Sequence, residues 1–126
     1  MPELKLGPVG QIARSVKDVR AAEAWYRDVL GLRHLYTYGS LAFFDCGGIR
    51  LFLAEAEGAD AAPQQSVIYF RVDDIEAAFE ALSGRGVAFQ APPHMIFRHE
   101  SGLEEWMAFF EDPDGGLLAL MAQVQS

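Results

Sequence analysis

The sequence predicts an α+β protein made of two similar halves, each with the element order βαβββ. The first observation is an internal repeat: residues 16–26 read V-K-D-V-R-A-A-E-A-W-Y and residues 72–82 read V-D-D-I-E-A-A-F-E-A-L. The second is that each copy follows an alternating apolar and polar segment, which is typical of a strand. The third is that about half the chain separates the two copies, as expected for one domain with an internal repeat.

In the first half, the alternation predicts a strand over residues 9–17. Asp18 is the expected N-cap of a helix that runs to about Leu30, because a carboxylate accepts hydrogen bonds from the free amides of the first turn. Gly31 is expected to end this helix in the left-handed conformation. Three further strands are predicted at residues 33–38, 41–46 and 49–54, joined by Gly39-Ser40 and Gly47-Gly48 turns.

The second half repeats this plan after a polar, proline-bearing linker at about 57–65. We expect a first strand at 66–72 and a helix that Asp74 caps and Gly84 or Gly86 ends. Further extended segments are predicted at residues 87–90, 95–98, 106–111 and 117–122. Pro92-Pro93 indicates an edge or a bend, residues 99–105 are expected to form a loop, and the D-P-D-G sequence predicts a tight turn. Module one then spans about residues 7–56 and module two about 66–124, within a single domain of 126 residues.

Composition restricts the function classes. The net charge of −8 and the isoelectric point near 4.7 argue against binding to nucleic acid or to anionic membranes. The apolar runs are too short to cross a bilayer. Cys46 is the single cysteine, so no internal disulfide is expected. These features favour a cytoplasmic protein.

The paired helix starts and the second-half sequence F-F-E-D-P-D-G-G-L-L-A-L resemble the glyoxalase / bleomycin-resistance / extradiol-dioxygenase (vicinal oxygen chelate) superfamily. The resemblance extends from Val9 to Val124. It implies two βαβββ modules that form a curled mixed sheet with a central cleft and helices outside. It also implies a homodimer, because family members commonly dimerise.

Metal-using members of this family hold a divalent ion with side chains from the first and last strands of both modules. Transferred to this chain, the first-strand positions fall on Gln11 and Val67. The last-strand positions fall on Ala119 and on Leu51 or Phe52, with a one-residue doubt in register. Because Gln11 is the only potential ligand, we expect no metal and no other cofactor. A relocated metal site using His94 or His99 would require a different register.

The expected cleft lining follows from strand alternation. If Gln11 points into the cleft, so do Ala13 and Ser15, which places Arg14 among the packing residues. By the repeat, Tyr69 and Arg71 also point inward. The predicted ligand-binding residues are Gln11, Ser15, Leu51, Tyr69, Arg71, His94, Trp106, Ala119 and Met121. A largely apolar lining with few polar groups suits an apolar or aromatic small molecule.

Each of these residues also has a plainer interpretation. Tyr69 could simply fill its strand, Arg71 could be a solvated surface charge, and Trp106 could belong to the core or to a dimer contact. His94 and Tyr69 are candidates for an acid–base pair.

Two functions compete, and a third hypothesis is an accessory or regulatory domain that binds no small ligand. The first is a metal-free small-molecule-binding protein, as in antibiotic sequestration. The alternative is a metal-dependent, glyoxalase-like lyase or isomerase, or a dioxygenase, with a metal-free acid–base enzyme as a variant.

Overall fold

The structure, a computed structural model, describes residues 4–56 and 66–125. The expected linker at 57–65 lies outside the described residues. The chain divides into two compact units, Met1–Ala62 and Pro63–Ser126, which we call module one and module two. Whether they act as a single domain, and whether a central cleft forms, stay predictions.

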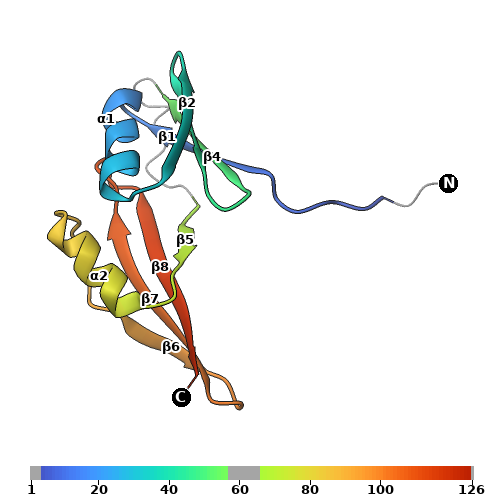
Figure 1. Cartoon of the computed structure of the whole chain (residues 1–126), viewed down its shortest axis with the longest axis vertical. Coiled ribbons are helices and arrows are strands. Elements are labelled where there is room, and N and C mark those ends of the chain that lie inside the picture. Colours follow the sequence, from blue (N-terminus) through green and yellow to red (C-terminus); the bar gives the residue numbers. More distant parts are fainter. Residues whose placement is uncertain (1–3, 57–65, 126) are drawn as a thin grey trace. The chain divides into compact units, whose positions relative to one another are not determined.

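Module one has the predicted βαβββ order. Its elements are β1 (Gln11–Val16), α1 (Val19–Ala24), the π-helical turn η1 (Trp25–Val29), β2 (Arg33–Tyr38), β3 (Leu41–Asp45) and β4 (Arg50–Glu55). The four strands form one mixed sheet in the order β1-β4-β3-β2, in which β1 and β4 are parallel and the other pairs are antiparallel. Figure 1 shows α1 beside this sheet.

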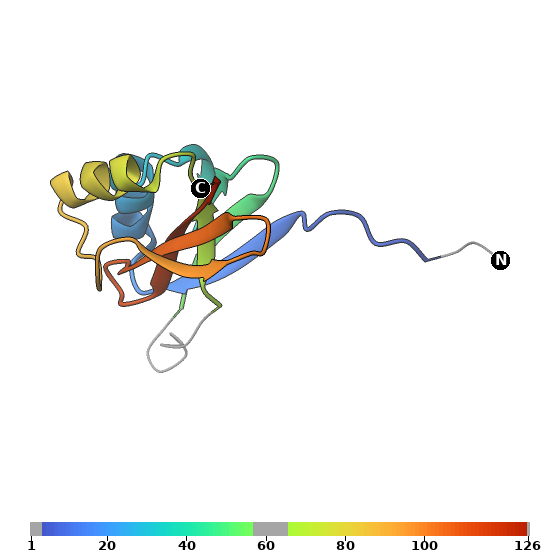
Figure 2. The same cartoon turned by 90° about the horizontal axis from the view of Figure 1, so that it is seen from below.

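Module two repeats the arrangement. Its elements are β5 (Ile68–Arg71), α2 (Ile75–Gly84), β6 (His94–Arg98), β7 (Leu103–Glu111) and β8 (Leu117–Gln125). The sheet order β5-β8-β7-β6 corresponds strand by strand to that of module one, with β5 and β8 parallel. In Figure 2, α2 lies over one face of the β7–β8 hairpin, and it packs against both strands. The α+β class and the two-module plan are therefore confirmed.

The helix ends follow from the predicted residues. Asp18 accepts hydrogen bonds from the amides of Arg20 and Ala21 at 3.0 and 3.1 Å, and Asp74 accepts one from Ala77 at 3.0 Å. Gly31 has φ +77°, which confirms the left-handed stop. The first helix is not α-helical throughout, because the Leu30 amide bonds to the Trp25 carbonyl five residues earlier at 3.2 Å.

Each helix packs against one face of its own sheet. In module one, Phe44 lies 6.0 Å from the Tyr26 ring, and its strand neighbour Leu51 is 2% exposed on the same face. Arg14 lies on this helix-packed face, as predicted, and is 2% exposed. In module two, Phe110 contacts Phe89, which contacts Phe79 of α2. Among the described residues, no helix combines the length and apolarity needed to span a membrane.

Several element boundaries differ from expectation, and strand β8 runs three residues past its expected end, to Gln125. Residues 87–90 make a single bridge, Phe89 to Phe110, rather than a strand. Strand β7 begins at Leu103, so the last three residues of the expected loop are extended. Their glutamates suit a strand here because Glu104 and Glu105 find partners on neighbouring strands, which the local polarity does not reveal.

Candidate functional site

Each sheet has a second face, opposite its helix, which we call the far face of that module. In module one, cross-strand pairing aligns Ala13, Phe52, Phe43 and Tyr36 in one row across the four strands. These residues alternate with Arg14, Leu53 and Phe44, which pack toward α1. The row therefore lies on the far face of module one.

Three aromatic rings of this row stack on one another. The ring centroids of Tyr36 and Phe43 are 4.6 Å apart with an interplanar angle of 24°, and those of Phe43 and Phe52 are 5.3 Å apart at 26°. Tyr36 is 48% exposed, whereas the two phenylalanines are half-buried. The three side chains form a continuous apolar strip on which a planar molecule can stack.

A cation lies over this strip. The Arg50 guanidinium carbon is 5.2 Å from the centroid of the Phe43 ring, within the range of a cation–π contact. The same guanidinium donates a hydrogen bond from Nε to Gln11 Oε1 at 2.8 Å. Arg50 and Gln11 are direct neighbours on the parallel strands β4 and β1, so the backbone register holds both together.

The far face of module two is also rich in apolar groups. Tyr69, Ala119 and Phe109 form one row across β5, β8 and β7, and the Tyr69 and Phe109 rings meet edge to face at 5.9 Å. The next row places Arg71, Met121, Met107 and His94 side by side. Methionines in such a surface adapt to ligands of different shape.

A polar cluster lies beside these rows. Glu105 Oε2 is 2.8 Å from His99 Nε2 and accepts a hydrogen bond from Gln123 at 3.0 Å. These bonds, together with the positive charge of Arg71, lower the pKa of Glu105 from its ordinary value. A carboxylate held in the charged form fixes the orientation of the imidazole ring.

Most predicted site residues lie on the far faces. These are Gln11 and Ser15 in module one and Tyr69, Arg71, His94, Ala119 and Met121 in module two. The His94 ring Nδ1 is 3.2 Å from the Pro92 carbonyl oxygen, at the edge of the sheet.

Two of the predicted residues, Leu51 and Trp106, do not lie on the far faces. Leu51 is buried on the α1 side, and Phe52 takes the far-face position, which settles the one-residue doubt in register. Trp106 lies on the α2 side of module two, where its indole Nε1 donates to Glu104 at 2.9 Å. A one-residue shift moves a side chain to the opposite face of a sheet, and the Gly-Gly turn did not determine that register.

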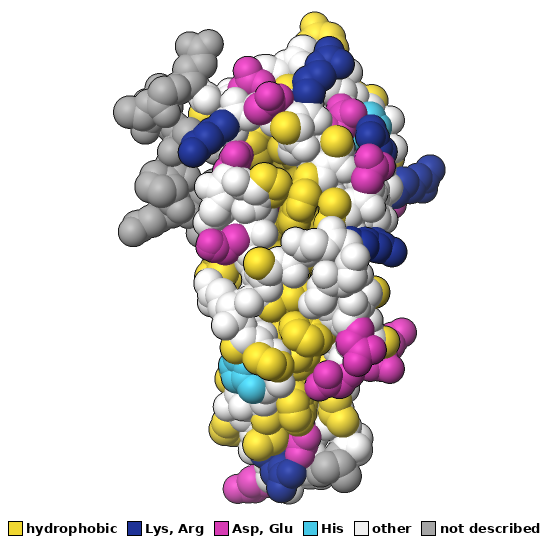
Figure 3. Space-filling model, turned by 90° about the vertical axis from the view of Figure 1, so that its left-hand side faces the viewer, with side chains coloured by type: hydrophobic (Ala, Val, Ile, Leu, Met, Phe, Trp, Pro, Cys, Tyr) yellow, Lys and Arg dark blue, Asp and Glu magenta, His cyan; other side chains and the backbone are white. Residues whose placement is uncertain are grey.

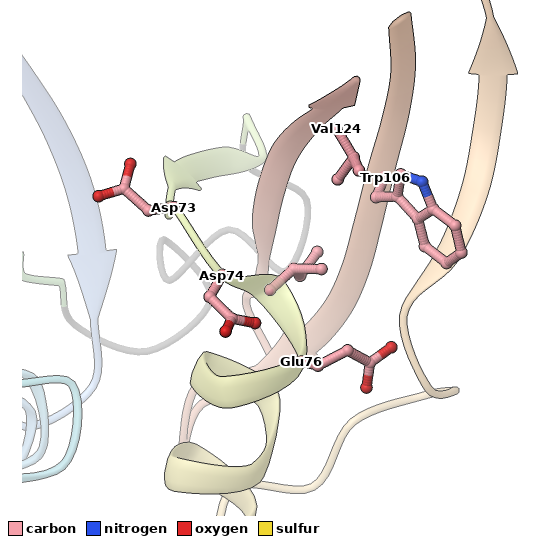
Figure 4. A pocket seen from close by; sticks show the side chains of 6 residues that line it. Asp73, Asp74, Glu76, Trp106 and Val124 are labelled. Atoms are coloured by element: carbon pink, nitrogen blue, oxygen red, sulfur yellow. The ribbon is translucent and has the colours of Figure 1, made fainter. Parts of the chain in front are cut away.

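Trp106 belongs to a pocket at the start of α2 (Figure 4). The pocket has a volume of about 390 Å³ and is lined by Asp73, Asp74, Ile75, Glu76, Trp106 and Val124. In the close-up, Trp106 and Val124 form one wall, and the Asp73 carboxylate points away from both. Asp74 is already used as the helix cap. The pocket lies on the α2 side of module two and contains one predicted site residue, Trp106, whereas the other predicted residues of this module lie on the far face.

The profile of the glyoxalase/bleomycin resistance protein/dioxygenase superfamily matches residues 9–120 of the chain. The chain belongs to this superfamily. Its similarity to the Bacillus subtilis (strain 168) protein YraH is 27% identity over 127 aligned residues, covering 87% of this chain and 94% of that protein.

Solved structures share the superfamily fold. A virulence protein from Salmonella typhimurium has a TM-score of 0.77 at 16% identity, covering 96% of this chain and 100% of that chain. A lactoylglutathione lyase from Agrobacterium tumefaciens has a TM-score of 0.73 at 23% identity, covering 94% and 95%. At these identities the similarity shows a shared fold only. The chemistry of each protein depends on the residues of its own site.

The four metal-ligand positions of the superfamily do not suit a divalent ion in this chain. Gln11 alone has a donor atom, whereas Phe52, Val67 and Ala119 have none. The Gln11 oxygen, moreover, already accepts from a guanidinium cation. Within residues 4–56 and 66–125, no three His, Cys, Asp or Glu side chains lie close enough to hold a metal ion. We therefore derive no chemistry through a metal.

Sequence reasoning missed several residues of these faces. It assigned no role to Phe43, which alternation along β3 places on the opposite face from Phe44. It assigned no role to Arg50, Glu105 or the pairing of His99. Alternation along β3 was the sequence signal that separates Phe43 from Phe44. The pairing of Phe43 with Phe52 follows only when the β3–β4 register is known.

Proposed function

We propose that this superfamily member is a metal-free protein that binds an apolar or aromatic small molecule on the far faces of its sheets. The stacked row of Tyr36, Phe43 and Phe52 carries the proposal. A stacked aromatic strip that remains partly exposed offers a flat ligand a preformed surface. Antibiotic sequestration is the form of this function that we propose to test first.

Binding would draw its free energy from buried apolar area, at about 25 cal/mol per Å². The polar groups at the edges of the strip would orient the ligand. Arg50 in module one lies over the Phe43 ring of the strip, and Arg71 in module two lies in the row next to that of Tyr69. This division between apolar contact and a few placed polar groups is typical of small-molecule sites.

Thermal-shift screening of the metal-stripped protein against planar and hydrophobic antibiotics tests the proposal. A ligand present at a hundred times its dissociation constant adds about 2.7 kcal/mol to the unfolding free energy. We expect hits in the wild type that disappear in Phe43→Ala. The matched control is Tyr38→Ala. Tyr38 is also an exposed aromatic residue of β2, but it lies outside the stacked row. Absence of any stabilising compound across a broad library would contradict the proposal.

A second candidate function is acid–base catalysis without a metal. The contact between His99 Nε2 and Glu105 Oε2 at 2.8 Å favours it, because a carboxylate-oriented imidazole can accept a proton from a bound molecule. The His94 and Tyr69 pair considered from the sequence lies on β6 and β5, the two edge strands of the same sheet. If a screening hit is turned over, His99→Gln should lower the rate by about 100-fold or more, whereas His94→Gln should not.

We also propose that the protein is a homodimer in solution. Apolar side chains on the edge strands β2 and β6 remain exposed, among them Leu35 at 40% and Phe97 at 55%. Acidic and basic side chains are interspersed on the face seen in Figure 3. Analytical ultracentrifugation should give twice the chain mass, and a monomer at micromolar concentration would contradict the proposal.

A further inference from the structure

We infer that the ligand of module one carries an anionic group, such as a carboxylate, and that Arg50 binds it beside Gln11, the first-strand position that resembles a metal-ligand position of the superfamily. The inference rests on the proposed function and adds the chemical class of the ligand. It comes from the way in which Gln11, Phe43 and Arg50 share one corner of the far face.

The Arg50 side chain is positioned by two contacts. Nε donates to Gln11 Oε1, and the guanidinium lies over the Phe43 ring. Both contacts hold the planar group without neutralising its charge. Within residues 4–56 and 66–125, no carboxylate pairs with Arg50, so Nη1 and Nη2 are available for a bidentate anion.

The nearest acidic neighbour on β3 is engaged elsewhere. Asp45 is paired with Arg50 across the strands, but its Oδ1 accepts a hydrogen bond from the Gly48 amide at 3.1 Å in the hairpin. The carboxylate therefore stabilises the turn. Arg50 keeps a net positive charge on a surface of a protein whose formal charge is −8.

The contact between Gln11 and Arg50 also bears on whether a metal ion can bind here. It occupies the first-strand ligand position of the superfamily, yet its carbonyl oxygen faces a permanent cation. A divalent ion bound to the same oxygen would lie within a few ångströms of that charge and would be repelled. At this first-strand position, the positive charge beside the Gln11 oxygen is that of the Arg50 side chain.

The aromatic strip lies next to this cation. A ligand with a flat ring on Phe43 and Phe52 can direct a carboxylate along the strip toward Arg50. Aromatic carboxylates therefore match both features, whereas a neutral aromatic matches the strip alone.

Isothermal titration calorimetry with 2-naphthoate and its neutral counterpart 2-naphthamide tests the inference. We expect the wild type to bind the acid at least tenfold more tightly than the amide, as a hydrogen-bonded charge pair provides. Arg50→Met should remove this preference and leave the amide affinity within about threefold. Gln11→Ala should weaken the acid selectively. Arg20→Met, which removes an exposed arginine on α1, is the matched control and should bind as the wild type does.

The outcomes separate the inference from the proposed function. Equal affinity of the wild type for acid and amide, or an acid affinity that Arg50→Met leaves unchanged, would overturn the inference while aromatic binding stands. The proposed function would be overturned as well if neither naphthalene probe binds and if anthracene-2-carboxylate and anthracene-2-carboxamide also fail to bind. Circular dichroism and the melting temperature of each variant establish that it is folded.

Discussion

Phe43 and Phe44 are consecutive residues of β3 whose rings lie on opposite faces of the module-one sheet. Phe43 stacks between Tyr36 and Phe52, whereas Phe44 is fully buried against Tyr26. The two adjacent phenylalanines therefore have different structural environments. One supports the fold and the other belongs to the candidate binding surface.

Alanine substitution at these two positions should separate binding from stability. Phe44→Ala should destabilise the protein by about 3–5 kcal/mol, because it leaves a cavity in the core. Phe43→Ala should cost less than half as much and should abolish binding of aromatic ligands. Urea denaturation and ligand titration of both variants measure this. Similar losses of stability in the two variants would show that Phe43 belongs to the core.

Purified protein should contain no stoichiometric divalent metal. The reason is that Val67, Phe52 and Ala119 offer no donor atom, and the oxygen of Gln11 is bound to Arg50. Elemental analysis after dialysis should give far less than one equivalent of Ni, Zn, Mn or Fe. A sample loaded with excess zinc and dialysed again serves as the control. About one equivalent retained in either sample would refute the metal-free assignment.

The Glu104 carboxylate should make stability depend on pH in the acidic range. Hydrogen bonds from Arg98 and then from Trp106 lower the pKa of Glu104 in the folded state. A lowered folded pKa means that the stabilisation is complete above the unfolded value of about 4.3 and is lost as pH falls through the folded value. Glu104→Gln should therefore be less stable than the wild type at neutral pH.

That difference should shrink steadily below pH 4. Urea denaturation at several pH values measures it, with Glu100→Gln on the exposed turn as the control. A difference between wild type and Glu104→Gln that stays constant from pH 7 to pH 3 would show that the charge of Glu104 contributes nothing.

The N-cap of α1 should also be measurable. Asp18 accepts two first-turn amide bonds, so Asp18→Ala should lower the unfolding free energy by about 1 kcal/mol. Asp18→Asn keeps an acceptor and should recover most of this loss. If the alanine and asparagine variants prove equally stable, the cap is not the source of the effect.

The architecture could be predicted because its signals are local. The repeat, the Asp18 and Asp74 caps and the left-handed Gly31 each depend on a few neighbouring residues. Far-face positions on β1 and β5 followed from alternation after one residue had been placed.

What could not be predicted depends on pairing between strands. The placement of Leu51 or Phe52 required the β3–β4 register, which two glycines in a turn do not specify. The extended start of β7 depends on partners for Glu104 and Glu105 from β6 and β8. The contact of Arg50 with Gln11 joins two strands that are far apart in the sequence. Such contacts have no local signature.

Ligand affinity measured with and without metal tests the central claim most directly. An aromatic hit should bind the wild type with the same dissociation constant in the presence of EDTA and after addition of Ni, Zn, Mn or Fe. It should not bind Phe43→Ala in either condition. Binding that appears only when a divalent ion is added, or that survives in Phe43→Ala, would contradict a metal-free site on the aromatic face.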